Sequence, residues 1–422
     1  MTEKNLFLYD LAVVAIFKDE ARYLKEWLDY HLLAGVEHFY LYNNESSDDF
    51  REVLAPYVEK NLVTLTEWSG RMMQYPAYND ALEKFRFECR YMAFIDLDEF
   101  ILPKSNRSVV EVVDEILSAD PNAAGLGINW QHFGSNGQET ADYSRGVLER
   151  FTRRAPSDWV EILSEDNMIG NSTIKSIVNP RCVECWWSPH YASLFRDFYT
   201  VNSNGNKTLY VTGFPIVADK IVVNHYYVKS FEEFAVKVNR GSACRSINHK
   251  RMEAFKKYDR NEIFDDEILK YRSARAENFS LESDVEKFRR VEKFLIETLT
   301  EDSPFSADEK FFVGKPETFL ACRFLAEKFG IKIGDRSAEE FALVWIYQSL
   351  NKDNVLTYSD VELFIEVLPE ILARPFPLAK KIFQTFALKT LPAMMDAAKN
   401  FKAWREYKNL RGLQRLFDSI SK

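Results

Sequence analysis

Short apolar runs alternate with amphipathic stretches along the first hundred residues of the chain. The runs that predict β-strands lie at residues 11–17, 38–42, 62–65 and 92–95. Between the first two runs, apolar residues such as Leu24, Trp27 and Leu28 recur at helical spacing, and Gly35 ends this helix. Strands that alternate with helices predict βαβ units around a mostly parallel, Rossmann-like sheet.

The second part of the chain has a different pattern. Of the 15 glycines, 11 precede residue 245 and 4 follow it. Helical periodicity with few strand signals marks the segments 281–299, 316–329, 338–350 and 361–372. We therefore expect an α/β domain at residues 1–245, followed by an all-helical domain at residues 246–422.

Composition excludes several classes of protein. Lys and Arg number 55 and Asp and Glu number 64, a net charge of −9, so the chain lacks the basic field that general nucleic-acid binding requires. No apolar stretch reaches the roughly 18 residues that a membrane-spanning helix needs. Five irregularly spaced cysteines without a recognisable signal peptide indicate a cytoplasmic protein, and we expect free thiols, the pair Cys182 and Cys185 included.

Two carboxylates follow the fourth predicted strand. Asp96 and Asp98 flank Leu97, and the period of two along a strand would place both side chains on one face. In open α/β sheets, ligands bind beyond the carboxyl ends of the strands, where this pair lies. Two converging carboxylates suit Mg²⁺ or Mn²⁺ together with a phosphate-bearing substrate. The alternative is a solvated acid pair at a strand end, and an isolated Asp-x-Asp does not decide between the two.

The segments around this pair resemble a known family. In chain order they are 17–20 (FKDE), 42–48 (YNNESSD), 91–100 (YMAFIDLDEF), 129–137 (NWQHFGSNG), 175–180 (KSIVNP) and 224–230 (NHYYVKS). They resemble nucleotide-sugar glycosyltransferases of the GT-A fold, in particular glycosyltransferase family 92 and its bacterial relatives. The resemblance spans residues 11–241. It implies a UDP-sugar donor, a Mn²⁺ or Mg²⁺ ion, and a glycan or lipid-linked glycan acceptor.

The resemblance also implies roles for residues at the strand ends. For the UDP-sugar it implies contacts from Phe17, Lys18, Glu20, Asn43, Asn44, Asp48, Gln74, Asn79 and Asp96, with Lys229 on the diphosphate. For the metal ion it implies Asp96, Asp98 and His225, with His190 as the alternative histidine ligand. Taken singly, the Asn and Asp residues are explained at least as well by turn formation and helix capping, and the histidines by burial in a core.

A base is needed if the reaction inverts the anomeric carbon, which the resemblance implies. A single in-line displacement requires a carboxylate that takes the proton of the acceptor hydroxyl. The candidate bases are Glu165 and Asp166, with Asp158 and Glu161 as nearby substitutes. A solvated acidic loop is the alternative interpretation of these residues.

Aromatic residues are frequent in the first domain, and aromatic rings stack on the apolar faces of sugar rings. We expect Trp130 and Phe133, together with His190, to lie near the acceptor. The segment 396–422 carries seven basic residues against three acidic ones. It could lie on an anionic membrane surface, at the inner face of the membrane, where a lipid-linked acceptor is found. The alternative is that this segment packs against its own domain.

These features together predict a cytoplasmic, metal-dependent glycosyltransferase. It would transfer a hexose, with galactose favoured, in the synthesis of a bacterial surface polysaccharide or lipopolysaccharide. A phosphatase of the haloacid dehalogenase type is an alternative source of Asp-x-Asp, but its motif continues with Thr or Val where this chain has Phe100. A sugar-binding or scaffold protein with the same fold is the non-enzymatic alternative.

Overall fold

The computed structural model describes residues 6–164, 167–195, 198–208, 210–241, 252–277, 279–299 and 321–330, except 323 and 327. The chain divides into two compact units, Met1–Val291 and Glu292–Lys422. Within the described residues, no helix is both long and apolar enough to cross a membrane.

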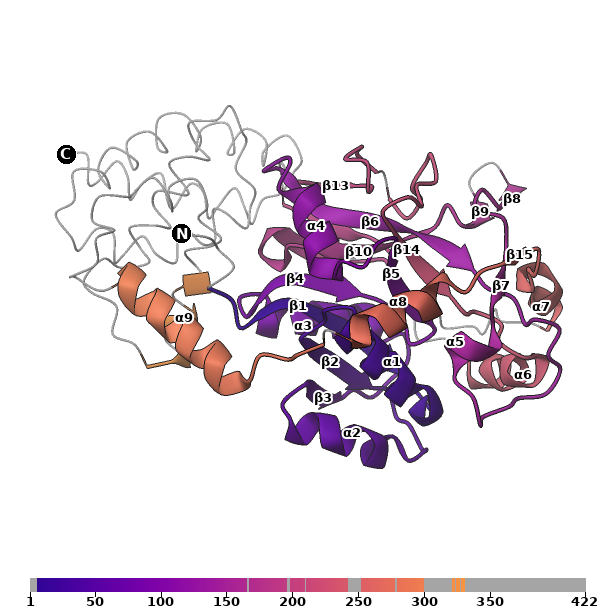
Figure 1. The fold of residues 1–422 in the computed structure, drawn as a ribbon, viewed down its shortest axis with the longest axis horizontal. Coiled ribbons are helices and arrows are strands. Elements are labelled where there is room, and N and C mark those ends of the chain that lie inside the picture. The colour runs from indigo at the N-terminus through magenta and orange to yellow at the C-terminus, as the bar shows by residue number, and fades with distance from the viewer. Residues whose placement is uncertain are drawn as a thin grey trace, which may run out of the picture. The chain divides into compact units, whose positions relative to one another are not determined.

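Nine strands of the described chain form the mixed sheet of the first unit (Figure 1). The strands lie in the order β3-β2-β1-β4-β10-β6-β14-β5, with β13 beside β6. Their bounds are β1 Tyr9–Phe17, β2 His38–Asn43, β3 Val63–Glu67, β4 Cys89–Phe94, β5 Glu99–Pro103, β6 Ala123–His132, β10 Ile174–Val178, β13 Tyr199–Val201 and β14 Ile221–His225. The first four strands in sequence are parallel, β10 is antiparallel to β4 and β6, and β5 is antiparallel to β14.

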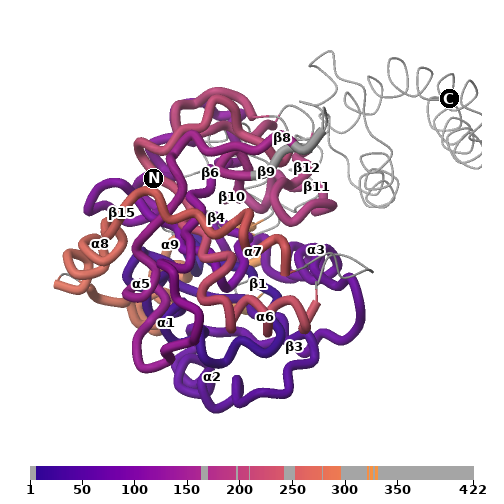
Figure 2. The backbone as a smooth tube through the Cα atoms, turned by 90° about the vertical axis from the view of Figure 1, so that its right-hand side faces the viewer, coloured from indigo at the N-terminus to yellow at the C-terminus, as the bar shows by residue number. Residues whose placement is uncertain are grey.

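Helices connect and cover these strands. Their bounds are α1 Ala21–Leu33, α2 Phe50–Glu59, α3 Gln74–Phe85, α4 Val109–Leu117, α5 Val147–Arg150, α6 Phe231–Arg240, α7 Glu253–Tyr258, α8 Glu267–Ala276 and α9 Asp284–Leu299. The remaining elements are β7 Arg153–Arg154 with β15 Ile263–Phe264, β8 Val160–Ser164 with β9 Asn167–Gly170, and β11 Val183–Trp186 with β12 Ala192–Leu194, preceded by the short helix η2 Pro180–Cys182. Figure 2, which shows the molecule from the side where α6 and α7 lie, places these two helices in front of the sheet.

The predicted α/β fold is confirmed, and all four expected strands form. The sheet is less uniformly parallel than expected, because β10 and β5 enter it in the opposite direction. The first unit also reaches beyond the predicted boundary at residue 245. β15 pairs with β7, and Arg275 of α8 donates to the Leu33 carbonyl at the end of α1 (2.9 Å), so these later elements belong to the α/β unit.

Helix α9 confirms the helical pattern at 281–299, and residues 321–330 include helical turns where the pattern 316–329 predicts a helix. The other predicted helices, at 338–350 and 361–372, lie outside the described residues. The basic segment 396–422 does as well.

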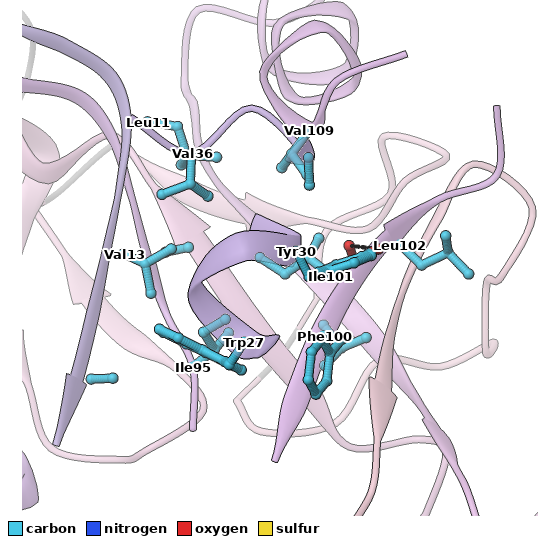
Figure 3. Close-up of a cluster of buried hydrophobic side chains, with 14 of the residues drawn as sticks. Leu11, Val13, Trp27, Tyr30, Val36, Ile95, Phe100, Ile101, Leu102 and Val109 are labelled. Atoms are coloured by element: carbon cyan, nitrogen blue, oxygen red, sulfur yellow. Dashed lines mark hydrogen bonds between the residues drawn. The ribbon is translucent and has the colours of Figure 1, made fainter. Parts of the chain in front are cut away.

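The core anchors the turn that follows β4 (Figure 3). Trp27 of α1 is fully buried, and its indole N–H donates to the Glu99 carbonyl (2.9 Å). One turn further along α1, the hydroxyl of the buried Tyr30 donates to the Ile101 carbonyl (2.8 Å). Buried carbonyls of β5 are thus satisfied by α1 side chains, so the packing of this helix fixes the position of the segment just after Asp98.

Candidate active site

Asp96 and Asp98 lie in the turn between β4, which ends at Phe94, and β5, which begins at Glu99. The Glu99 N–H donates to the Asp96 carbonyl (3.1 Å), and the Glu99 carboxylate accepts from the Asp96 N–H (2.8 Å). The two aspartates are therefore not alternate residues of one strand, and the period-two argument for a shared face was wrong. Each carboxylate has its own set of partners.

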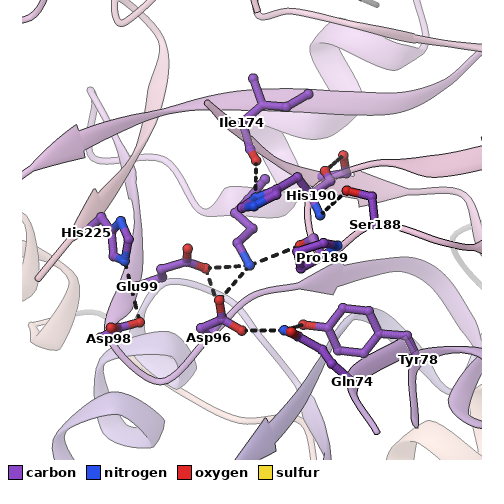
Figure 4. Close-up of polar contacts among 12 residues, drawn as sticks. Gln74, Tyr78, Asp96, Asp98, Glu99, Ile174, Ser188, Pro189, His190 and His225 are labelled. Carbon is purple, nitrogen blue, oxygen red and sulfur yellow. Dashed lines mark hydrogen bonds and ion pairs between the residues drawn. The ribbon is translucent and has the colours of Figure 1, made fainter. Parts of the chain in front are cut away.

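The Asp96 carboxylate belongs to a network of polar side chains from β10, α3 and the start of β5 (Figure 4). Lys175 of β10 donates to one oxygen (2.8 Å) and Gln74 at the start of α3 to the other (2.9 Å). The Lys175 ammonium also lies 3.3 Å from the Glu99 carboxylate, and both of these side chains are fully buried. Burial opposes the charge of Lys175, but Asp96 and Glu99 outweigh it and raise the pKa of this lysine.

The Asp98 carboxylate faces a different pair of residues. Lys237 of α6 donates to Oδ2 and also to the Tyr227 carbonyl (2.9 Å). His225, at the end of β14, points its Nε2 at Oδ1 from 3.7 Å (Figure 4). Burial works against ionisation of Asp98, but Lys237 and His225 hold its pKa well below the usual range. Asp98 is therefore ionised at neutral pH.

The separation of Asp98 and His225 is suited to a divalent cation. At 3.7 Å their two atoms are too far apart for a hydrogen bond. Two ligands that each lie about 2.1 Å from one cation are at most about 4.2 Å apart, so this pair could share one. No group of three or more His, Cys, Asp or Glu side chains in the described part of the chain is arranged to hold a metal. Asp98 and His225 would thus supply two ligands, and Mg²⁺ commonly takes its others from phosphate and water.

Three basic residues follow β14 on the same side of the sheet. Lys229, predicted for the diphosphate, is buried with φ +53°, and its ammonium lies 4.4 Å from the centre of the Tyr23 ring. Burial lowers the pKa of Lys229, and the charges of Glu20 and Asp98 oppose that shift. The sequence analysis missed the other two, Lys237 and Arg240. Their helical spacing on α6 places them in the same region, but nothing local marks them as site residues.

Arg240 secures the loop after β1. It forms an ion pair with Glu20 (2.5 Å) and donates to the Lys18 carbonyl (2.7 Å). The Lys18 side chain lies near Glu45. Phe17 is buried against Phe50, so its ring is part of the core and does not face a ligand. For Phe17 the predicted donor contact is therefore wrong, because the last residue of β1 points inward.

The polar residues after β2 mainly hold their own loop. Asn43 donates to Glu67 (2.6 Å) and accepts from the Ser46 N–H (3.0 Å), and Asn44 donates to the Trp68 and Gly70 carbonyls (2.8 and 3.0 Å). Asp48 accepts from the Ala21 N–H at the first turn of α1 (2.7 Å). Asn79 likewise exchanges two hydrogen bonds with the backbone of Trp186 (2.8 and 2.9 Å). These contacts support the turn-and-cap alternative, whereas Gln74 alone of the predicted amides contacts Asp96 directly.

Trp130 lies among three histidines. Its ring centre is 4.3 Å from that of His225, 5.1 Å from His190 and 5.2 Å from His132. The parallel register of β6 and β14 pairs His132 with His225, and burial lowers the pKa of His132 to about 3. His190 Nδ1 contacts the Ile174 carbonyl (3.2 Å), so of the two predicted histidines it is His225 that faces Asp98.

Two predictions on the acceptor side have different outcomes. Phe133 is 1% exposed and stacks on the buried Tyr226 ring (4.6 Å), so it belongs to the core and the prediction that it contacts an acceptor is wrong. Glu165 and Asp166 lie outside the described residues. Of their substitutes, Asp158 is exposed and Glu161 pairs with Lys257 (3.2 Å) beside a cavity of about 480 Å³.

The expected free thiols are confirmed at Cys89 and Cys185.

Comparison with known proteins gives one family match. Residues 13–273 match the profile described as glycosyltransferase family 92. A glycosyltransferase family 92 protein of Ricinus communis is 24% identical over 245 residues, which cover 57% of this chain and 39% of the relative. A galactan beta-1,4-galactosyltransferase of Arabidopsis thaliana, GALS2, is 30% identical over 100 residues, which cover 21% of this chain and 19% of the relative. The chain thus spans about two fifths or less of these relatives.

The similarity to a solved structure is weaker than the match to the family profile. S. aureus TarS 1–349 in complex with UDP is 10% identical with a TM-score of 0.31, and the match covers 80% of this chain and 87% of that chain. At this TM-score, the likeness carries no inference about the ligands of this chain.

Proposed function

The chain belongs to glycosyltransferase family 92, and on that basis we propose that it transfers a hexose from a UDP-sugar to a glycan acceptor. Galactose is the first candidate, because two relatives bear the name galactan beta-1,4-galactosyltransferase. The observation that carries the proposal is the pairing of Asp98 with His225 at 3.7 Å, with Lys229 and Lys237 close by. Family membership speaks against the haloacid dehalogenase alternative.

Asp98 and His225 would hold a Mn²⁺ or Mg²⁺ ion, and the diphosphate of the donor would supply further ligands. When bound, the ion neutralises the charge that builds on the diphosphate as the glycosidic bond breaks. Lys229 and Lys237 place two more positive charges at the same edge of the sheet, where they stabilise the leaving UDP. Asp96 is held in place by Gln74 and Lys175. It would either accept a hydrogen bond from a hydroxyl group of the UDP-sugar or bind the ion.

For the acceptor we propose attack from the face opposite UDP, which inverts the anomeric carbon. Trp130 and His190 line the acceptor side of Asp98 and His225 in this proposal. The catalytic base in this proposal is Glu165 or Asp166, with Asp158 and Glu161 as substitutes. We place the reaction in the cytoplasm, in the synthesis of a bacterial surface polysaccharide or lipopolysaccharide.

The proposal is tested by measuring UDP release from a panel of UDP-sugars, with and without Mn²⁺, in the presence of β-1,4-linked galactose oligomers. We expect release from UDP-galactose that depends on the oligomer and that disappears in Asp98→Asn, while circular dichroism shows that this variant is still folded. NMR of the product from the α-linked donor should show a β-linkage. Absence of transfer from every UDP-sugar would contradict the proposal, and an α-linked product would contradict inversion alone.

A further inference from the structure

Aromatic side chains gather at the surface beside the candidate active site. Trp187 is 48% exposed and Tyr210 is 64% exposed, and their ring centres are 6.2 Å apart. The half-buried Tyr191 lies with its ring centre 6.4 Å from that of Tyr210. The indole N–H of Trp187 donates to the Ser193 hydroxyl (2.7 Å), which fixes the orientation of the ring. We call Trp187, Tyr191 and Tyr210 the aromatic platform.

The first segment of the aromatic platform is attached to β10, the strand that carries Lys175. Ile174 accepts from His190 Nδ1 (3.2 Å), Lys175 donates to the Pro189 carbonyl (3.1 Å), and Ser176 donates to the His190 carbonyl (2.7 Å) (Figure 4). Three successive residues of one strand thus hold the turn that lies between Trp187 and Tyr191 in sequence.

The second segment is attached to the same strand. The Ile174 N–H donates to the carbonyl of Val211 (3.1 Å), the residue after Tyr210, and the Gly213 N–H donates to the Ser172 carbonyl (2.8 Å). Both parts of the aromatic platform are therefore fixed relative to each other and to Lys175.

The aromatic platform is also close to Asp96. The Lys175 ammonium contacts both the Asp96 carboxylate (2.8 Å) and the Pro189 carbonyl. Trp187 and Tyr191 are each two residues from Pro189, a separation of at most about 7 Å along the chain. The aromatic platform therefore lies within a few residues of a contact that Lys175 shares with Asp96.

Exposed aromatic rings that are rigidly held at such a place suit a carbohydrate. The Trp187 and Tyr210 rings meet edge to face, at 72°, and a pyranose presents an apolar C–H face of about the size of one such ring. A protein partner would need roughly 800 Å² of contact from each side, far more than three rings supply. The chemistry therefore favours a sugar.

We propose that the aromatic platform is a glycan subsite, which binds a sugar unit of the acceptor next to the unit that receives the transferred hexose. The acceptor is then an oligosaccharide or polysaccharide of at least two units, and its affinity rises with chain length. The role of the bound glycan as acceptor rests on the proposed function, whereas the binding of glycan by the platform does not.

The test measures binding without any donor, by isothermal titration calorimetry of the full chain with galactose, β-1,4-galactohexaose and maltohexaose. We expect a hexasaccharide to bind more tightly than galactose. Trp187→Ala and Tyr210→Ala should each weaken it about five- to tenfold, as loss of one aromatic contact does. Tyr210→Phe should bind like the wild type, because the ring and not the hydroxyl makes the contact. Phe264→Ala on β15, which removes a ring that is 61% exposed elsewhere, is the matched control.

The outcomes separate this inference from the proposed function. Equal hexasaccharide affinity in the wild type, Trp187→Ala and Tyr210→Ala overturns the subsite, as does a wild type that binds neither hexasaccharide. Transfer from UDP-galactose, measured in the same variants, can persist in either case. Conversely, glycan binding that depends on both rings in a chain that transfers no sugar supports the subsite and contradicts the proposed function.

Discussion

Replacing Glu233 by glutamine tests how α6, which carries Lys237 and Arg240, is held beside the site. The Glu233 carboxylate accepts from both terminal nitrogens of Arg150 (2.8 and 2.9 Å), from the Tyr23 hydroxyl (2.8 Å), and from the N–H and hydroxyl of Ser230, the N-cap of α6. The side chains of Arg150 and Glu233 are each 2% exposed. The substitution keeps the shape of the side chain but leaves the buried guanidinium without its counter-charge.

The loss of stability expected for Glu233→Gln follows from the pKa of Glu233. Burial opposes its charge, but the bonds from Arg150 and Ser230 outweigh it and lower the pKa from 4.5 to about 2. A shift of that size corresponds to about 3 kcal/mol of stability at pH 7. A depressed carboxyl pKa stabilises the folded state above pH 4.5, and this contribution is lost as the pH falls toward 2. Breaking a buried ion pair by removing one partner typically costs about 3–5 kcal/mol, in agreement with this value.

The assay is urea unfolding followed by tryptophan fluorescence, at pH 7 and at pH 3.5. We expect Glu233→Gln to be about 3 kcal/mol less stable than the wild type at pH 7, and the difference to shrink to about 2 kcal/mol at pH 3.5. Glu232→Gln, on the same helix but exposed, is the control and should lose less than about 1 kcal/mol. A loss below about 1 kcal/mol in Glu233→Gln at pH 7 would refute the reasoning, and a loss that does not change with pH would refute its electrostatic part.

Three further experiments test the site itself. Asp98→Asn should weaken Mn²⁺ binding measured by calorimetry with UDP present, in a variant that circular dichroism shows to be folded; unchanged Mn²⁺ affinity would remove Asp98 from the metal site. His225→Ala should also weaken Mn²⁺ binding, and His190→Ala should not; the reverse result would reassign the ligand. Lys175→Met should cost about 3–5 kcal/mol in urea unfolding, because Asp96 and Glu99 lose the buried ammonium that they share. Burial already raises the pKa of Glu99, so adding Glu99→Gln, which removes one of the two acids, should recover part of that loss. If the double variant is less stable than Lys175→Met, the Glu99 charge is not the cause.

The first half of the sheet could be predicted from the sequence because its signals are local. Each of β1 to β4 is an apolar run between helical or turn segments, and consecutive parallel strands follow from the βαβ order. The position of β10 could not be predicted in this way. It lies between β4 and β6, antiparallel to both, although it follows β4 by some 80 residues in sequence. Pairing over such a separation leaves no mark in the local pattern.

The same distinction applies to the site residues. Asp96, Asp98 and His225 stand at the ends of apolar strands, and the strand-end argument finds them. Lys175 stands inside a strand, where a charged residue is ordinarily read as a solvent-facing position of an alternating pattern, and only the placement of β10 beside β4 turns it toward Asp96. The prediction for Phe133 was wrong for the opposite reason. Its aromatic ring could stack on a sugar, but the ring is buried in the core.

The sequence also suggests that Asp96 and Asp98 are equivalent, and their lysines show that they are not. Asp96 is neutralised by Lys175, which is fully buried and also contacts the Glu99 carboxylate and the Pro189 carbonyl. Asp98 is neutralised by Lys237 of α6, which also contacts the carbonyl and the ring of Tyr227 (2.9 Å and 4.0 Å) and, like Asp98, is 12% exposed. A divalent cation can therefore take the place of Lys237 at Asp98 more readily than that of Lys175 at Asp96. We expect Lys237→Met to cost less stability than Lys175→Met and to change ligand affinity more, and equal losses of stability in the two variants would contradict this division.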